Sequence, residues 1–331
     1  MSPANPLRVL ALAVALLALL PASARAQAEL RTWLDPEFGR QMFRSDYKLT
    51  FYPDQAVEGQ RTDLSVLEHS FSLTAPVFQN ATDEWTLSGR VRFQDIDTRA
   101  ILPDTGDRFP DELWDVRFGA SYRHKFDNGW IAGASLTVGS ASDKPFASLD
   151  EMFVRAIGML RVPSAERNAW IFSLIYSSDQ EFLGGVPVPG IAYLWAPSER
   201  FNAVIGVPFS SIQWKPIEAL TLEAEYFPLR RIRARATYQV LPPLRVYVGF
   251  DWDNDHYFRA DRRAKTRQLF YYEKRLTAGA RFDLRHVGFE LSGGYAFDRF
   301  YFEGENYSDR HDNRLDIGAG PFVAGRVSIR F

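Results

Sequence analysis

The chain has no cysteine among its 331 residues, which excludes a disulfide framework and thiolate metal ligands. Its five histidines lack the paired spacing of a metal site, and no glycine-rich phosphate-binding motif is present. The 39 Lys and Arg residues nearly balance the 41 Asp and Glu residues, which gives a formal net charge of −2. We therefore expect no metal, no cofactor and no nucleic-acid partner.

Long apolar runs are also absent beyond residue 26, where no stretch approaches the roughly 18 residues that a membrane-spanning helix needs. Aromatic residues nevertheless make up 15% of the chain, with 26 Phe, although the mean hydropathy is negative. A mature chain of this kind is either soluble or crosses a membrane as a closed β-barrel, which satisfies every backbone polar group in lipid.

The first 26 residues have the features of a signal peptide. Residues 9–20 form an unbroken apolar run that Pro21 ends, and Ala24-Arg25-Ala26 has the small-x-small form of a cleavage site. We therefore expect a bacterial chain with residues 1–26 as signal peptide, 27–43 as a periplasmic N-terminal segment and 44–331 as a transmembrane β-barrel.

Beyond the signal peptide, apolar and polar residues alternate with a period of two, which indicates β-strands. The alternating segments are roughly 9 to 14 residues long, too long for most soluble sandwiches and suited to tilted membrane strands. Their polar positions repeatedly carry arginine. The clearest segments are 85–94, 114–123, 231–240, 244–253 and 287–298.

The connections between these segments alternate between short turns and long polar stretches, as in bacterial outer-membrane barrels. The alternation holds throughout only if 201–207 and 210–215 are two short strands joined around Pro208. The prediction is an all-β fold, a single antiparallel transmembrane β-barrel of about 16 strands (range 12–16). Short turns fall at 127–129, 197–199, 242–243 and 285–286, and long stretches at 53–61, 95–112, 140–150, 179–187, 254–266 and 298–314.

The final strand places Val327, Ile329 and Phe331 on one face and Arg326 and Arg330 on the other. Its ending resembles the C-terminal signal of outer-membrane proteins, in which a terminal aromatic follows alternating apolar residues. The resemblance implies recognition by the barrel-assembly machinery and places Phe331 against outer-membrane lipid. Val323 departs from the pattern, because many members have Tyr there.

A second resemblance involves residues 187–197, the run Ile205-Gly206-Val207-Pro208 and the run Trp214-Lys215-Pro216. These segments are similar to an uncharacterised family of porin-like outer-membrane barrels that is classified as a domain of unknown function. The resemblance implies the fold and no particular activity.

The phase of the strands points a set of charged residues into the barrel. Such a lumen creates a transverse field that sorts solutes by charge, or else a neutralised network that closes the interior. We expect a porin-like passive channel for small polar or anionic solutes, with a closed structural or binding barrel as the alternative. The predicted pore-lining residues are Arg90, Arg92, Arg117, Arg123, Arg231, Arg233, Arg235, Arg245, Arg275, Arg281, Glu223, Glu225, Asp251, Glu273 and Glu290.

An enzyme is not expected, but one hydrolase alternative stays open. Asp95 and Asp97 lie near the outer end of one strand, and Asp253, Asp255 and His256 lie near the outer end of another. Aspartates and a histidine at the rim of a barrel activate water in omptin-type proteases. This alternative requires the two groups to meet in the folded barrel.

Overall fold

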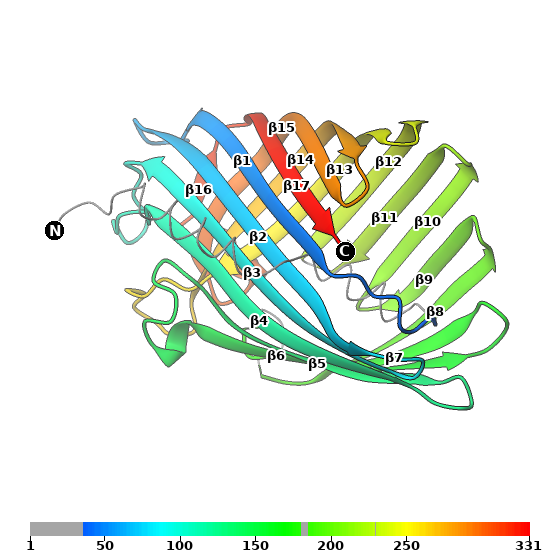
Figure 1. The fold of residues 1–331 in the computed structure, drawn as a ribbon. Coiled ribbons are helices and arrows are strands. Elements are labelled where there is room, and N and C mark those ends of the chain that lie inside the picture. Colours follow the sequence, from blue (N-terminus) through cyan, green and yellow to red (C-terminus); the bar gives the residue numbers. More distant parts are fainter. Residues whose placement is uncertain (1–35, 180–184, 229) are drawn as a thin grey trace.

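The computed structural model describes residues 36–179, 185–228 and 230–331. Antiparallel strands, joined in sequence order, close into a barrel (Figure 1). The strands are β1 (Arg44–Ala56), β2 (Asp63–Gln79), β3 (Asp83–Thr98), β4 (Glu112–Lys125), β5 (Ile131–Ser142), β6 (Met152–Pro163), β7 (Ala169–Ser177), β8 (Val188–Ser198), β9 (Phe201–Val207), β10 (Ser210–Ile217), β11 (Leu220–Phe227), β12 (Arg231–Leu241), β13 (Leu244–Tyr257), β14 (Gln268–Asp283), β15 (Val287–Gly304), β16 (Leu315–Ile317) and β17 (Gly320–Arg330).

The barrel has sixteen strand positions, because the short β16 and the longer β17 both pair with β15 and together occupy one place. This confirms the predicted all-β barrel and its strand number. β9 and β10 are the two short strands expected around Pro208. The predicted signal peptide and residues 27–35 lie outside the described residues.

The seam of the barrel joins the last strand to the first. β17 pairs with β1 from Arg44 opposite Arg330 to Phe51 opposite Val323. Beyond this register, the backbone N–H of Phe331 donates to the carbonyl oxygen of Phe43 (2.9 Å). The Phe331 ring lies against the rings of Phe43 and His286, and it is exposed on the outer surface with Val327, while Ile329 is half-buried.

The two ends of the barrel differ in their connections. One end, here called the turn end, has short turns such as Asp127–Gly129, where Gly129 takes the positive φ of 81° that a tight turn requires. The opposite end, called the loop end, has the longer connections 99–111, 143–151, 258–267 and 305–314. In Figure 1 these loops gather at the left. The 3-10 helices η1 (Leu149–Glu151) and η2 (Tyr307–Asp309) lie within them.

The outer surface is apolar around the barrel, because alternate side chains of the strands point outward. Examples from separate strands are Leu87, Phe118, Phe172, Ile205 and Leu291, each 42–67% exposed. Among the described residues, no helix is long and apolar enough to cross a membrane.

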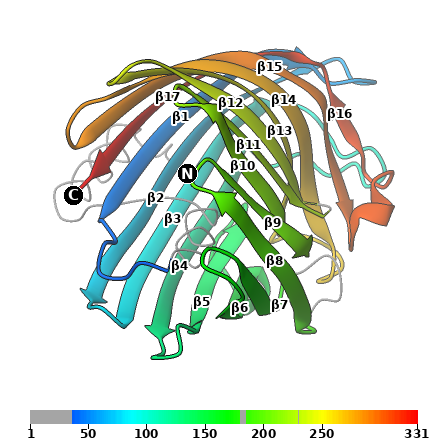
Figure 2. The same ribbon diagram turned by 90° about the vertical axis from the view of Figure 1, so that its right-hand side faces the viewer.

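At the loop end, β13 turns inward and reaches the opposite wall. The N–H of Phe258 donates to Ala141 at the end of β5 (2.7 Å), and the N–H of Ala260 donates to the Asp143 carboxylate (2.7 Å). A parallel bridge joins Phe258 to Ser142. This crossing, called the partition, divides the interior that the strands enclose (Figure 2).

One side of the partition is filled by an apolar core. The loop 99–111 folds into the barrel as a hairpin, in which Phe109 donates its N–H to the carbonyl of Ala100 (3.0 Å). Leu102 and Phe109 are buried, and the Phe109 ring packs edge-on against Tyr301 (4.7 Å between centroids). Buried side chains of β1–β6 and β13–β17 complete this core.

We predict that Phe331→Ala lowers the amount of folded barrel in the outer membrane, because it removes the ring at the seam and the terminal aromatic of the expected assembly signal. The measurement is the mobility shift of unheated membrane samples in SDS gels. Phe282→Ala is the control, because Phe282 is a similarly exposed ring at the turn end of β14. Equal yields of both variants would contradict the prediction.

Candidate functional site in the barrel interior

Most of the predicted pore-lining residues take part in ion pairs. Near the turn end, Arg281 contacts Asp283 (2.9 Å) and Glu290 (3.5 Å), and Arg245 also pairs with Asp283. Arg326 reaches Glu290 from β17 (3.6 Å). These three arginines and two carboxylates form a ladder of ion pairs across β13, β14, β15 and β17.

Further toward the loop end, the pairs continue between neighbouring strands. Arg233 donates to Asp251 (2.6 Å), and Asp253 accepts from both Arg231 (2.5 Å) and Arg275 (3.0 Å). Arg275 also contacts Glu273 (3.1 Å), so all three acids of this group are matched by guanidinium groups.

Arg92 makes a contact across the barrel. Its Nε donates to Glu68 on the neighbouring strand β2 (2.8 Å), and its Nη1 donates to Asp255 on β13 (2.5 Å). β3 and β13 are not neighbours in the sheet, so this guanidinium spans the interior beside the partition. Its side chain is only 10% exposed.

Three predicted residues have other surroundings. Arg123 pairs with Glu84 at the turn end and is covered by the ring of Phe38, 4.4 Å from the guanidinium carbon. Arg235 lies over the Tyr247 ring (4.0 Å). Glu223 accepts from the amide of Gln213 (2.9 Å).

The predicted residues Arg90 and Arg117 border a cavity of about 360 Å³ beside the partition. Its lining has five arginines and two carboxylates, together with His256. These charged residues are Arg90, Arg117, Arg155, Arg230, Arg231, Glu225 and Asp255. We take this cavity, called the guanidinium cavity, as the candidate functional site.

The guanidinium groups face the cavity and their counter-charges lie behind them. Asp115 accepts from Arg117 (2.5 Å) and lies 3.8 Å from Arg90. The side chains of Arg90 and Arg117 are 32% and 25% exposed, whereas that of Asp115 is 3% exposed. Arg155 (20%) has the same relation to Asp179 (2%), at 3.4 Å. Arg90, Arg117 and Arg155 are therefore more exposed than Asp115 and Asp179, while Glu225 and Asp255 also line the cavity.

Asp179 lies in the connection after β7 and also accepts from Nε2 of His256 (3.1 Å). Burial opposes its ionisation, but the hydrogen bond from His256 and the nearby guanidinium of Arg155 hold the pKa of Asp179 well below its usual range. The strand phase predicts that His256 points out of the barrel. Instead His256 lines the cavity. The end of β13 crosses the interior, so the face of the strand that carries His256 borders the cavity there.

The second wall of the cavity is aliphatic. Met159, Ile171 and Val204 come from β6, β7 and β9, and Phe209 packs against them from the turn before β10. The lining continues to Ile191, Val207 and Tyr226, whose side chains are exposed on the outer surface. The cavity thus extends to the ends of the short strands β9 and β11.

Sequence reasoning missed Arg155 and this aliphatic wall. Both faces of β6–β9 are largely apolar, so their alternation does not show which face is inner. Glu68 was missed because it is a single charged residue on its face of β2. The inner faces of β12 and β3 carry charged residues repeatedly, which makes them easier to recognise.

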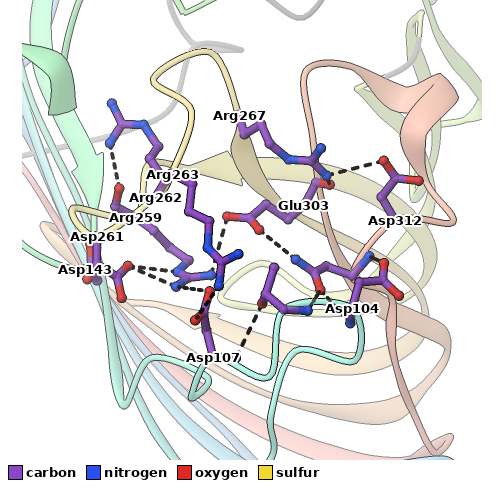
Figure 3. A network of polar contacts seen from close by, with 12 residues as sticks. Asp104, Asp107, Asp143, Arg259, Asp261, Arg262, Arg263, Arg267, Glu303 and Asp312 are labelled. Carbon is purple, nitrogen blue, oxygen red and sulfur yellow. Dashed lines mark hydrogen bonds and ion pairs between the residues drawn. The ribbon is translucent and has the colours of Figure 1, made fainter.

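Arginines of the loop 258–267 fasten the loop end (Figure 3). Arg259 contacts Asp107 (3.4 Å) and Glu303 (3.4 Å). Arg267 contacts Asp312 (3.3 Å). Arg262 donates to Glu151 (3.1 Å) and to the carbonyl of Asp150 (2.7 Å). Four loops are thereby held together over the mouth.

Glu151 is a buried acid of this network. Burial opposes its charge, but hydrogen bonds from Ser148 and Arg262 outweigh that effect and hold its pKa below the ordinary value. The side chain of Glu151 also completes a capping box with Ser148 at the start of η1.

The residues of the hydrolase alternative are not brought together. Asp95 and Asp97 are exposed on the outer face of β3. Asp253 and Asp255 lie on the inner face of β13 and are paired with arginines. The wall of the barrel separates the two groups.

Comparisons with known proteins give the following. No family model matches the chain, and no curated protein matches it. Solved structures that resemble it include the beta domain of a Bordetella autotransporter (12% identity, TM-score 0.33), an outer-membrane channel from Pseudomonas putida F1 (12%, 0.35) and a mutant porin of Rh. blastica (11%, 0.38). Each match covers 88% of this chain, and 99%, 94% and 99% of the other chain. At these identities and scores they assign no function, and the resemblance to an uncharacterised family stays a prediction.

We predict that Arg92→Ala destabilises the barrel by about 3–5 kcal/mol, because it leaves the buried Glu68 and the partly buried Asp255 charged without their shared partner. The measurement is urea unfolding of the refolded protein, followed by circular dichroism. Arg245→Ala is the control, because its pair with Asp283 is more exposed and should be worth about 1 kcal/mol or less. Equal losses in the two variants would show that the cross-barrel contact has no special role.

We also predict that acid loosens residues 143–151. A lowered pKa stabilises the folded loop at pH values above the ordinary 4.5, and this stabilisation is lost as the pH falls through the lowered pKa. Amide hydrogen exchange, corrected for intrinsic rates, should show protection at pH 7 and less protection well below pH 4.5. Glu151→Gln should exchange faster than wild type at pH 7 and show a smaller change with pH. Protection that does not change with pH in the wild type would refute this.

Proposed function

We propose that this protein is a bacterial outer-membrane diffusion channel for small anionic solutes. The observation that carries the proposal is the guanidinium cavity, in which exposed arginine side chains stand in front of buried carboxylates inside a closed barrel of sixteen strands. A surface of this kind attracts anions and lowers the cost of moving them through a low-dielectric wall.

Insertion in a membrane is supported by the outer surface. Besides its aliphatic side chains, this surface has five tryptophans near the turn end, which is where amphipathic rings meet the lipid headgroups in membrane barrels. They are 40–47% exposed. These residues are Trp85, Trp130, Trp170, Trp195 and Trp214.

The filled half of the interior limits what can pass. The apolar core and the partition occupy part of the interior at the loop end, so solutes would have to pass beside them, along the cavity that residues of β2–β9, β11 and β12 line. A route confined to that cavity suits small solutes. It also gives Arg90, Arg117 and Arg155 direct contact with whatever passes.

A second candidate is a closed structural or binding barrel. It is favoured by the same partition, together with the arginine contacts that hold the loops over the mouth. In that case the interior would bind a molecule without conducting it. Electrical recording separates the two candidates.

We predict single-channel current steps when the purified barrel is inserted in planar bilayers at high salt. In a KCl gradient, the reversal potential should show preference for chloride. Arg90→Gln with Arg117→Gln should reduce that preference, because it leaves Asp115 in the wall without its guanidinium partners. Arg167→Gln is the control, because Arg167 pairs with Glu199 in a turn outside the interior. Absence of current steps would reject the channel, and an unchanged reversal potential in the double variant would reject anion selection by the cavity.

A further inference from the structure

We propose that the guanidinium cavity binds a small amphipathic monoanion. Its carboxylate would lie on the guanidinium groups of Arg90, Arg117 and Arg155, and its apolar body against the aliphatic wall of β6–β9. This inference rests on the proposed function, because it places the ligand on the path that solutes take through the barrel. It adds the chemical class of the solute.

The head-group site is built around the ring of Phe153. The guanidinium carbons of Arg117 and Arg155 lie 5.3 and 5.5 Å from the centre of that ring, on which both cations can rest. Gly139 makes room for it, because a Cβ atom at that position would lie 2.8 Å from the tip of the Phe153 ring. Arg90 stands opposite Arg117 in the register of β3 and β4.

Arg117 and Arg155 therefore lie against one ring and Arg90 is paired with the same carboxylate as Arg117, while Asp179 pairs with Arg155. A guanidinium group offers paired N–H donors whose geometry matches a carboxylate. The side chains of all three arginines keep part of their surface free toward the cavity.

The apolar part of the site begins directly beside this head group. Ile157 and Met159 are the next inward residues after Arg155 on β6. On β7, Ile175 lies opposite Ile157, and Ile171 belongs to the same apolar cluster as Met159. Inward residues of a water-filled barrel are usually polar. An aliphatic wall next to a cationic cluster is complementary to a molecule that has an apolar body and one negative charge.

Small residues of β3–β5 also line the cavity. They are Ser88, Gly119 and Thr137. A cavity of about 360 Å³ is at the lower end of the roughly 300–1,000 Å³ range of small-molecule sites. This volume fits an aromatic acid or a short-chain acid better than a lipid with long acyl chains.

The test is a ¹⁹F NMR titration of 4-fluorobenzoate with the folded full-length barrel in detergent, with empty micelles as the background. We expect a saturable change in the fluorine signal. The neutral 4-fluorobenzamide and the anion fluoroacetate, which lacks the apolar ring, should each bind at least about tenfold more weakly. Equal binding of the neutral analogue or of fluoroacetate would overturn the proposal.

Variants assign the binding to this cavity. Arg117→Gln with Arg155→Gln should weaken 4-fluorobenzoate binding at least about tenfold, because it removes charge-assisted hydrogen bonds. Ile171→Ser should weaken 4-fluorobenzoate and leave fluoroacetate unchanged. Arg167→Gln should bind as the wild type does. Mobility in unheated gels verifies folding of each variant, and the Ile171 variant keeps the test decisive if the double variant does not fold.

The outcomes separate this inference from the channel itself. Current steps without saturable binding would overturn the amphipathic ligand and leave the channel standing. Saturable binding without current steps would support the site and reject the channel. Displacement of 4-fluorobenzoate by laurate at lower concentration than by unlabelled benzoate would identify a long-chain ligand and overturn the small one.

Discussion

The crossing of β13 over the interior is the constraint on which the rest of the structure depends. The hydrogen bond from Phe258 to Ala141 holds the end of β13 against the opposite wall, and the guanidinium of Arg92 joins β3 to Asp255 beside it. A sixteen-stranded barrel is wide enough for an open lumen. The crossing turns it into a filled half and a hollow half, and the candidate site belongs to the hollow one.

The arrangement of charge follows from the cost of leaving an ion unpaired in a confined interior. Where the interior is narrow, each arginine lies against a carboxylate on a neighbouring strand, as Arg233 does with Asp251. Where the partition leaves space, Arg90 and Arg117 share the single buried Asp115 and keep part of their surface exposed. The same ion-pair chemistry therefore stabilises one half and leaves an anion-attracting surface in the other.

The sequence predicted the fold well because the alternation of a lipid-exposed strand is local information. Alternate positions must be apolar wherever they face hydrocarbon, so strand phase, strand number and the two short strands around Pro208 followed from residue order. The inward placement of residues such as Arg231, Arg275 and Glu290 followed from the same phase. What each charge contacts did not, because ion pairs depend on which strands face each other across the interior.

By itself, then, the sequence predicted a closed antiparallel barrel of about sixteen strands. Only the tertiary structure decided how its interior is used. The inward fold of the loop around Phe109 and the contact between Arg92 and Asp255 join segments far apart in the chain, which no local period records. The sequence also did not show which face of β6–β9 is inner, because both faces are apolar. The pairing with neighbouring strands decides that Arg155 and Ile171 point inward.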